Sequence, residues 1–449
     1  MVPNSSYNIC NYRDKKIQIK DIPENFNDLV KSLSIKNPPD IWLDKWEESQ
    51  KTYPGLDAID FIKNDFIIDA NKYLQLPDEA VQAILVTLNI IRNNEELARL
   101  LWLSHYILFP SEIGVGIPDN LNNIKQHGVA FPDICIPQVN MDFLKGMFPA
   151  VLLLSGLLRL LRFYKERSIP EQVIIDTLSD VDIWMEDYYA KNGTWGLMEF
   201  WWLYNHFSGR LFRIGRLQFI YAGFKGNVRV FRNIRTGVVV SLSEVDIRYR
   251  ADGQVDGTND IYDRHGAWVS TLVVTDNSIK GNPISPLGFA ENKVIELAKD
   301  EWREVLSKGS PVLDVHIATG SKLSHEACGE SFKASVKFFE RYFPELQFDG
   351  YMCTSWLLDP QLQCILPRES NIVKFQREFY LYPKKSDDFQ TFERVFGNKP
   401  DNMKTLKAET SMQKAILDYV NKGNNMRQAS MFLLKDDLQY WGQAFYQEQ

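Results

Sequence analysis

Cysteine is scarce in this 449-residue sequence, and the way the cysteines are spread excludes two kinds of site. There are five, an odd number, and they form no Cys-x-x-Cys pair. Neither a disulfide framework nor a structural zinc site fits such a pattern. The histidines show no HExxH or comparable spacing, so we predict no metal. A reduced, cytoplasmic chain is the expectation.

Long apolar runs are also lacking. The most hydrophobic stretch, FPAVLLLSGLL at 148–158, has about half of the roughly 20 residues that a membrane-spanning helix needs. The N-terminus, MVPNSSYNICNYRDKK, has no apolar segment like that of a signal peptide. We therefore predict no membrane span and interpret 148–158 as a buried core helix.

An excess of positive charge is absent too. Lys+Arg number 51 and Asp+Glu 58, which gives a net charge of −7 and argues against a nucleic-acid partner. Residues 210–250 are nevertheless basic, with nine Lys and Arg against two acidic residues. This segment either attracts a nucleotide phosphate or an acidic partner, or is neutralised by acidic helices of the N-terminal half. The 45% hydrophobic and 24% charged content is typical of a folded globular protein.

The periodicity of apolar residues divides the chain into two domains. Residues 1–208 read as all-helical; PDEAVQAILVTLNIIR at 77–92, for example, places its apolar residues on one stripe. From 209 onward, β-branched and aromatic residues alternate with glycines, which indicates strands and turns. We predict a second domain at 209–449, with a β-rich elaboration at 226–286. NKVIELAKDEWREVLSKG at 292–309 predicts a helix.

The most informative pattern is a strand, a loop, a helix and a second strand. PVLDVHI at 311–317 is the first strand, Ser324 caps the helix, and 351–358 is the second strand. A helix between two strands favours a parallel, right-handed crossover. The fold class is thus α+β, an all-helical domain followed by an α/β domain with a mixed, partly parallel central sheet.

Asp314 and His316 lie two residues apart on the first strand, so they share a face with Cα atoms roughly 6.5–7 Å apart. Ligands of α/β sheets bind at the carboxyl ends of strands, which is where this pair stands. His316 is therefore a candidate general base that Asp314 orients. The alternative is a buried histidine satisfied by Asp314 or by a backbone carbonyl.

The loop after this strand opens a helix, where backbone N–H groups can hold a phosphate. The candidate contacts are Ala318, Thr319, Gly320, Ser321 and Lys322. No GxGxxG or GxxxxGK[ST] motif is present, and an ordinary strand-to-helix turn is the alternative.

Alternation divides the second strand into two faces, with Cys353 and Ser355 on one and Thr354 and Trp356 on the other. Cys353 is better interpreted as a small core residue than as a nucleophile. Asp359, followed by a proline, predicts an N-cap of the next helix.

Five segments together resemble a known family. They are RIGRLQF (213–219), VLDVHI (312–317), SWLLDPQL (355–362), SNIVKFQREF (370–379) and T-x-x-Q (410–413). In this order they are similar to bacterial acyltransferase-domain proteins, which have a helical N-acyltransferase N-terminal domain and a GNAT-like C-terminal domain. The resemblance runs from about residue 40 and is strongest at 312–379.

The resemblance implies two parallel strands that splay apart and receive the pantetheine arm of acyl-CoA. The pyrophosphate is then expected at the loop 318–322, with Cys353 and Trp356 beside the cofactor. The family's usual Q/R-x-x-G-x-G/A loop is absent, so an acyl carrier protein is a second possible thioester donor. No tightly bound cofactor is implied, since the thioester is a cosubstrate.

The function that follows is direct acyl transfer from a pantetheine thioester to a small-molecule amine or similar nucleophile. His316 takes the acceptor's proton, Asp314 orients His316, and Ser355 protonates the departing thiolate or holds substrate. Ser370, Asn371 and Gln376 are candidate substrate-binding residues through the resemblance alone.

Two other hypotheses belong to different classes. The chain is alternatively a non-catalytic GNAT-like scaffold that binds a thioester, a nucleotide or a protein partner. A Ser/His/Asp hydrolase has the residue types it needs but lacks the GxSxG elbow.

Overall fold

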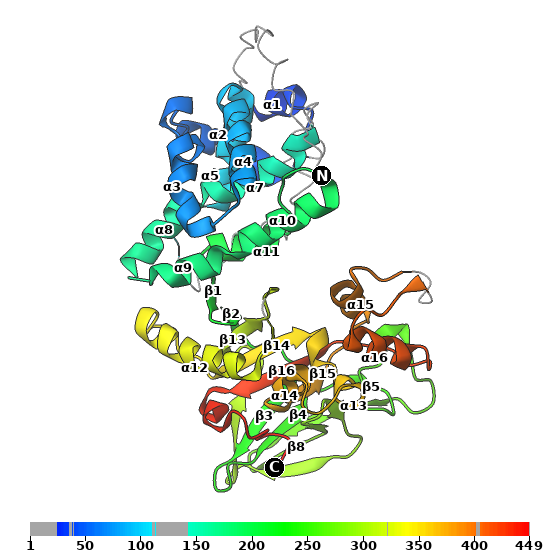
Figure 1. The fold of residues 1–449 in the computed structure, drawn as a ribbon. Coiled ribbons are helices and arrows are strands. Elements are labelled where there is room, and N and C mark those ends of the chain that lie inside the picture. Colours follow the sequence, from blue (N-terminus) through cyan, green and yellow to red (C-terminus); the bar gives the residue numbers. More distant parts are fainter. Residues whose placement is uncertain are drawn as a thin grey trace. The chain divides into compact units, whose positions relative to one another are not determined.

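The computed structural model describes residues 25–35, 38, 40–109, 113, 142–320, 322–400 and 405–448. The chain forms two compact units. Of the described residues, one unit contains those up to 113, together with 142–161 and 181–207, and the other contains those of 162–180 and 208–448. Helices precede the first strand and sheets follow it (Figure 1).

All elements described before residue 208 are helices. They are α1 (Phe26–Ser32), α2 (Asp40–Lys51), α3 (Asn64–Leu74), α4 (Asp78–Arg92), α5 (Glu95–Leu108), α7 (Asp142–Ser155), α8 (Leu157–Glu166), α9 (Glu171–Leu178), α10 (Asp180–Asn192) and α11 (Phe200–Phe207), with 3₁₀ turns at Leu56–Ala58 and Asp60–Ile62. α4 begins as its sequence predicts, with Pro77 at the N-cap and two acidic residues in the first turn. Its Ile84 and Leu88 are fully buried.

The apolar stretch 148–158 is a buried core segment, as predicted. It forms the end of α7 and the start of α8, and Phe148, Leu152 and Leu157 are completely buried. Among the described residues, Gly146–Glu166 is the one helical segment apolar and long enough to span a membrane, but 78% of its most apolar window is buried. A side chain at Gly156 would collide with the Phe109 ring, so glycine lets the two segments approach.

The second unit is built on a six-stranded sheet in the order β1-β2-β13-β14-β16-β15. Its strands are β1 (Leu211–Ile214), β2 (Leu217–Gly223), β13 (Pro311–His316), β14 (Gly350–Ser355), β15 (Tyr380–Pro383) and β16 (Ala429–Leu434). β13 and β14 pair in parallel, and the other neighbours pair antiparallel. The helix α12 (His325–Tyr342), capped by Ser324, connects β13 to β14. The predicted mixed sheet and parallel crossover are confirmed.

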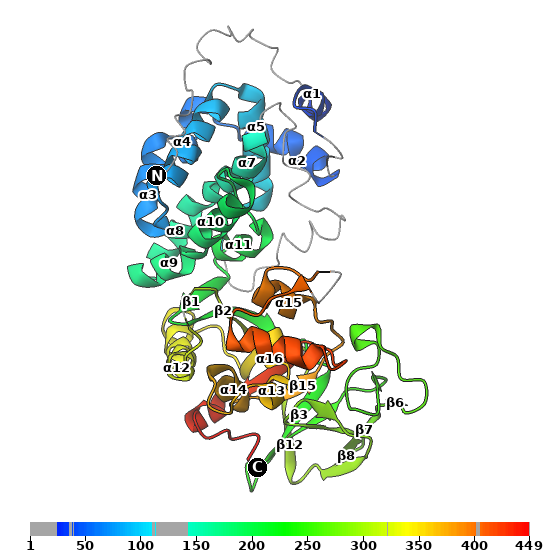
Figure 2. The same cartoon turned by 45° about the vertical axis from the view of Figure 1, so that its right-hand side comes forward.

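The two faces of this sheet differ in what covers them. The ring of Phe332 on α12 packs 4.8 Å from Tyr351 and 5.9 Å from Phe219, so α12 covers an aromatic face. From the opposite face, the Tyr380 hydroxyl donates to the Ile284 carbonyl of a second sheet. Figure 2 shows α12 on one side of the unit and β3 and β12 away from it.

The second sheet has five strands in the order β10-β9-β4-β3-β12, with smaller sheets β11-β8-β7 and β5-β6 beside it. The strands are β3 (Val228–Asn233), β4 (Val239–Ser243), β5 (Arg248–Tyr249), β6 (Trp268–Val269), β7 (Leu272–Val274), β8 (Ser278–Gly281), β9 (Pro283–Ser285), β10 (Phe289–Ala290), β11 (Ile295–Ala298) and β12 (Trp302–Leu306).

The helix predicted at 292–309 is wrong, because this segment forms β11 and β12. β11 pairs with β8 and β12 pairs with β3. Leu297 is buried with Phe231 and Leu242, and Ile295 and Trp302 pack against the same cluster. The strand partners and this shared cluster outweigh the local helical preference.

Five arginines of the basic segment 210–250 are paired with acidic residues of their own unit. The partners of Arg229, Arg232, Arg235, Arg248 and Arg250 are respectively Glu244, Asp437, Glu301, Asp256 and Asp252. The expectation that helices of the N-terminal half supply the negative charge is not met for these five arginines. It is met for Arg213, whose Nη1 lies 4.0 Å from the carboxylate of Asp180, the first residue of α10.

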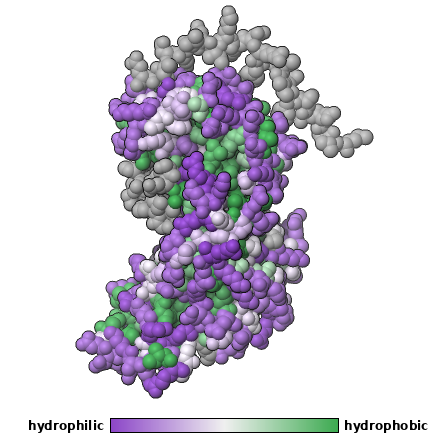
Figure 3. Space-filling model, turned by 90° about the vertical axis from the view of Figure 1, so that its left-hand side faces the viewer, coloured by the Kyte–Doolittle hydropathy of each residue, from purple (hydrophilic) through white to green (hydrophobic). Residues whose placement is uncertain are grey.

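The remaining helices are α13 (Leu362–Ile365), α14 (Asn371–Arg377), α15 (Phe389–Phe396) and α16 (Ser411–Val420), with 3₁₀ helices at Trp356–Leu358 and Lys435–Tyr440. The T-x-x-Q motif is the capping box of α16, in which Thr410 accepts from the Gln413 amide and Gln413 accepts from the Thr410 amide. On the face drawn in Figure 3, hydrophilic residues dominate the surface and hydrophobic residues show in patches.

Candidate active site

The parallel strands β13 and β14 separate before either of them ends. Their pairing stops at Asp314 opposite Met352, although β13 continues to His316 and β14 to Ser355. Each strand keeps its outer neighbour over this stretch, β2 for β13 and β16 for β14. The opening is thus held rigidly from both sides, and backbone groups inside it do not pair across the gap.

A pocket of about 600 Å³ lies at this opening. Its lining includes Asp314, Val315 and His316 from β13, and Met352, Cys353 and Thr354 from β14. Further lining residues are Lys225, Gly226, Asn227, Ile247, Val255, Tyr382, Lys384, Lys385 and Ser430. The volume lies in the range of small-molecule sites.

Asp314 and His316 project from the same face, as their spacing predicts. The His316 Nε2 lies 3.9 Å from the Asp314 Oδ1, and the side chains are 33% and 24% exposed. Burial raises the pKa of Asp314, while His316, Lys225 and Lys384 act in the opposite direction. An imidazole beside a half-buried carboxylate can accept and return a proton within the pocket.

The residues opposite this pair in the sheet complete a polar group that sequence analysis missed. Thr354 stands two residues after Met352 and therefore on the face of Asp314 and His316. Its hydroxyl lies 2.7 Å from the Ser430 hydroxyl of β16. On β2, Gln218 is opposite His316 and donates to the Asp180 carboxylate. Alternation separated Thr354 from Ser355, but only the strand register shows which of them faces His316.

Ser355 and Cys353 project from the other face of β14. The Ser355 hydroxyl accepts from the Leu357 amide and so caps a 3₁₀ helix, and Ser355 does not line the pocket. Cys353 lines the pocket but is 4% exposed, and burial raises its thiol pKa strongly. A thiol kept protonated is a poor nucleophile, which fits the interpretation of Cys353 as a core residue.

The loop after β13 leads into the N-terminus of α12. Ala318 is buried, Thr319 and Lys322 are exposed, and Gly320 has a φ of +110°, which favours glycine. Ser321 lies outside the described residues. The Lys322 carbonyl accepts from the Arg216 Nε, and among described residues the buried Nη1 of Arg216 has no hydrogen-bond partner. The guanidinium of Arg216 therefore lies beside this loop, which the sequence alone did not predict.

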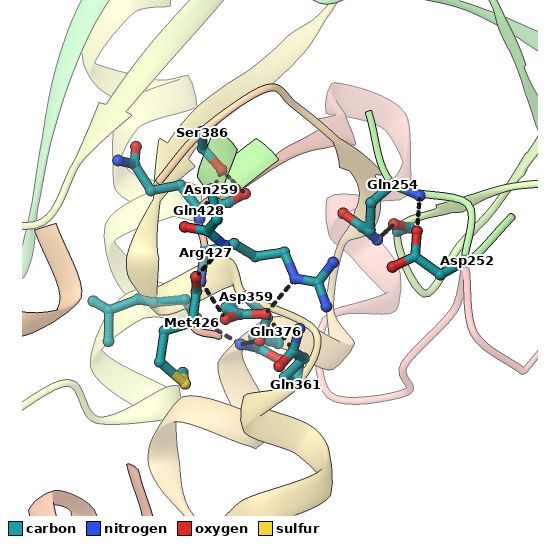
Figure 4. Close-up of polar contacts among 12 residues, drawn as sticks. Asp252, Gln254, Asn259, Asp359, Gln361, Gln376, Ser386, Met426, Arg427 and Gln428 are labelled. Atoms are coloured by element: carbon teal, nitrogen blue, oxygen red, sulfur yellow. Dashed lines mark hydrogen bonds and ion pairs between the residues drawn. The ribbon is translucent and has the colours of Figure 1, made fainter. Parts of the chain in front are cut away.

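The other predicted site residues do not line this pocket, and Figure 4 shows one of them, Gln376, beside Asp359. Gln376 is fully buried and donates to the carbonyls of Leu357 and Asp359. Trp356 packs against the apolar cluster of Leu362, Ile416 and Met426. Ser370 caps α14, and the exposed Asn371 is its first residue.

Asp359 does not cap a helix in the predicted way, because α13 begins only at Leu362 with Gln361 at the N-cap. The Asp359 carboxylate accepts from the amides of Gln361 and Arg427 and lies 3.7 Å from the Arg427 Nε (Figure 4). Burial raises the pKa of Asp359 to about 6. In place of a cap it forms a buried ion pair that ties β14 to the segment before β16.

Among the described residues there is no group of three His, Cys, Asp or Glu side chains placed to hold a metal ion.

Comparison with known families and structures gives a consistent picture. The N-acyltransferase N-terminal domain matches residues 65–209, and the GNAT-like C-terminal domain matches 211–433. No curated protein matches the chain. A crystal structure of an acyltransferase with decanoyl-CoA is 21% identical with a TM-score of 0.58, covering 91% of this chain and 99% of that one. An acyltransferase with decanoyl-CoA and teicoplanin is 19% identical with a TM-score of 0.59 and the same coverage. At these identities the likeness establishes a shared fold.

Proposed function

The chain belongs to the proteins that join an N-acyltransferase N-terminal domain to a GNAT-like C-terminal domain, and we propose that it transfers an acyl group from a pantetheine thioester to an amine or similar nucleophile. The observation that carries the proposal is the opening between β13 and β14, with Asp314 and His316 projecting beside it. Such an opening can admit an extended thioester arm. The histidine then lies next to the carbon that reacts.

In the proposed reaction, His316 takes a proton from the acceptor nitrogen as this nitrogen attacks the thioester carbon. A C–N bond forms, the C–S bond breaks, and the thiolate that leaves is protonated to a thiol. Backbone N–H groups of the separated strands polarise the carbonyl during the attack. Asp314 orients the imidazole and stabilises its protonated form.

The hydroxyl pair of Thr354 and Ser430 takes the role of holding substrate or protonating the thiolate, which the sequence assigned to Ser355. We assign Ser355 no part in the reaction, because its hydroxyl lies on the other face of β14 and accepts from the Leu357 amide. The proposal likewise gives no substrate-binding role to four other residues predicted from the sequence, because they make packing and capping contacts around Asp359 and α14. They are Trp356, Ser370, Asn371 and Gln376.

The donor's phosphates are assigned to the loop that holds Ala318, Thr319, Gly320 and Lys322, with Arg216 beside it. Acyl-CoA is the donor proposed first, because the structural neighbours were crystallised with decanoyl-CoA or CoA. An acyl carrier protein is the second candidate. The acceptor is proposed to be a small molecule, because one neighbour was crystallised with teicoplanin as well.

The proposal also covers the domain plan and location predicted from the sequence. Residues 1–208 form a domain that is helical throughout, 209–449 form the acyltransferase domain, and 226–286 are an elaboration of it. The enzyme acts in the cytoplasm.

The test measures thiol release from octanoyl-CoA and decanoyl-CoA with and without a mixture of amines, alongside thermal unfolding. A ligand at 100 times its Kd stabilises the folded state by about 2.7 kcal/mol. We expect stabilisation by acyl-CoA and thiol release that depends on the amine. Stabilisation without thiol release indicates the non-catalytic scaffold. Thiol release without any amine indicates a hydrolase. The proposal is overturned if no thioester causes either stabilisation or thiol release.

A further inference from the structure

Three lysines surround the pocket at the strand opening. Lys225 follows β2, and Lys384 and Lys385 follow β15, so segments far apart in the sequence bring them together. All three are exposed, and of the described residues that line the pocket with them, Asp314 alone is acidic. The pocket therefore carries a local excess of positive charge in a protein with a net charge of −7.

Two of these lysines are not neutralised by acidic neighbours. Lys225 and Lys384 form no ion pair with any described residue, in contrast to Arg229, Arg232 and Arg235 of the same unit. Their positive charges act on the site, because both lysines lower the pKa of Asp314, which burial raises. Unpaired cations around a concave site concentrate anionic ligands.

The phosphates of the donor have another cation to bind. The loop at 318–322 leads into α12, and the Nη1 of Arg216 is buried there without a hydrogen-bond partner among described residues. Arg216 is anchored to α12 through its amide, which donates to the Ser331 hydroxyl. α12 covers the aromatic face, whereas Asp314, His316 and Thr354 project from the other. The two sets of cations are thus associated with opposite faces of the sheet.

We infer that the acyl acceptor is an anionic amine, a small molecule with a carboxylate or phosphate group that Lys225 and Lys384 bind while its nitrogen lies at His316. This inference rests on the proposed function and specifies the class of its acceptor. A second positive charge on the acceptor would be repelled by the same lysines. The lysines act here as binding residues and take no part in proton transfer.

The experiment uses the full chain with CoA bound and three pairs of probes. Each pair has an anionic and a neutral amine: glutamate with glutamine, glucosamine 6-phosphate with glucosamine, and phosphoethanolamine with ethanolamine. Binding of each probe is measured by calorimetry for the native protein and for the K225Q/K384Q variant. The control is Lys337→Gln, an exposed lysine of α12, the helix that covers the other face of the sheet.

We expect at least one anionic probe to bind more tightly than its neutral partner, and K225Q/K384Q to reduce that preference about 10-fold. Raising the salt concentration should weaken the anionic probe selectively. K337Q should leave the preference unchanged. The inference is overturned if no anionic probe exceeds its neutral partner. It is also overturned if K225Q/K384Q weakens CoA binding and spares the probe preference, since the lysines then serve the donor's phosphates.

Failure of this inference is distinct from failure of the proposed function. Thiol release from octanoyl-CoA that requires an amine but does not depend on its charge leaves the acyltransferase intact and removes the anionic acceptor. Absence of amine-dependent thiol release overturns the function itself.

Discussion

Two carboxylates of the second unit, the partly exposed Asp314 and the buried Asp359, show how similar chemistry serves different ends. Asp359 is completely buried, accepts from two backbone amides and lies 3.7 Å from the Arg427 guanidinium. The Asp314 side chain is 24% exposed, and its Oδ1 lies 3.9 Å from the His316 imidazole. Burial raises the pKa of both groups.

The difference lies in what each carboxylate can still do. Asp359 is fixed by the backbone on both sides, so it holds the chain together and has no access to a ligand (Figure 4). Asp314 borders a pocket of about 600 Å³ together with its partner His316, so a ligand in the pocket can reach both side chains. A shifted pKa by itself therefore does not identify a site; access to a pocket does.

The largest expected effect is on turnover at the exposed pair. His316→Gln removes the general base, so kcat/KM should fall by about 100- to 10,000-fold while the Tm stays nearly constant. Amine-dependent thiol release and thermal unfolding measure the two quantities. The matched control is His265→Gln, at an exposed loop histidine, which should leave both unchanged. Retained turnover in His316→Gln would remove this residue from the mechanism.

An effect of comparable size is expected at the buried pair of Asp359 and Arg427, where it changes the free energy of unfolding and not the turnover. Arg427→Met leaves the Asp359 carboxylate buried without its cation, which should lower the free energy of unfolding by about 3–5 kcal/mol. Urea unfolding measures this, and Asp359→Asn in the same chain should restore part of it. Arg235→Met is the control, because that side chain is 70% exposed beside Glu301 and its loss should cost under about 1 kcal/mol. Equal losses in the two arginine variants would contradict the contrast.

The third effect is the pH dependence of stability at Asp359. Its pKa of about 6 in the folded protein lies above the ordinary value of 3.8, so the folded state takes up a proton between these values. Its contribution to stability is therefore fully present below about pH 4 and is lost as the pH rises to about 6. Asp359→Asn carries no titratable group at this position and should lack that loss.

The measurement is the free energy of unfolding of both proteins from pH 4 to pH 7. The difference between their free energies of unfolding, wild type minus Asp359→Asn, should decline over this range by roughly 1–3 kcal/mol and then level off. A difference that grows with pH would mean that Arg427 dominates and that the carboxylate is ionised throughout.

The smallest effects distinguish the two faces of β14. Thr354→Val breaks the hydroxyl pair with Ser430 beside His316 and should lower kcat/KM by about 10-fold. Ser355→Ala removes a cap on the other face and should cost about 1 kcal/mol of stability with turnover within about two-fold. The two variants control for each other. The opposite pattern would return Ser355 to the site.

Much of the fold follows from patterns within single segments. Helix α4 starts where Pro77 and the acidic first turn place it, and Ser324 caps α12. The parallel crossover between β13 and β14 follows from the order strand, helix, strand. The spacing of Asp314 and His316 likewise puts both on one face, because side chains alternate along any strand.

Features that depend on a partner segment escaped prediction. Residues 292–309 contain charged and apolar residues that suit a helix, yet pairing with β8 and β3 makes them strands. The cations of 210–250 find acidic partners that are up to about 200 residues away in the sequence, as Arg232 does in Asp437. A single sequence does not encode such pairings in its local composition.

By itself, the sequence determined which side chains of each strand share a face, because alternation is a property of one backbone. Only the tertiary structure decided that the face of Asp314 and His316 is also the face of Thr354, Ser430 and Lys384, since this depends on the register of β14 and β16 against β13. A shift of one residue in that register would have placed Ser355 in the pocket instead. Register is fixed by the packing of both faces of the sheet, which no single strand contains.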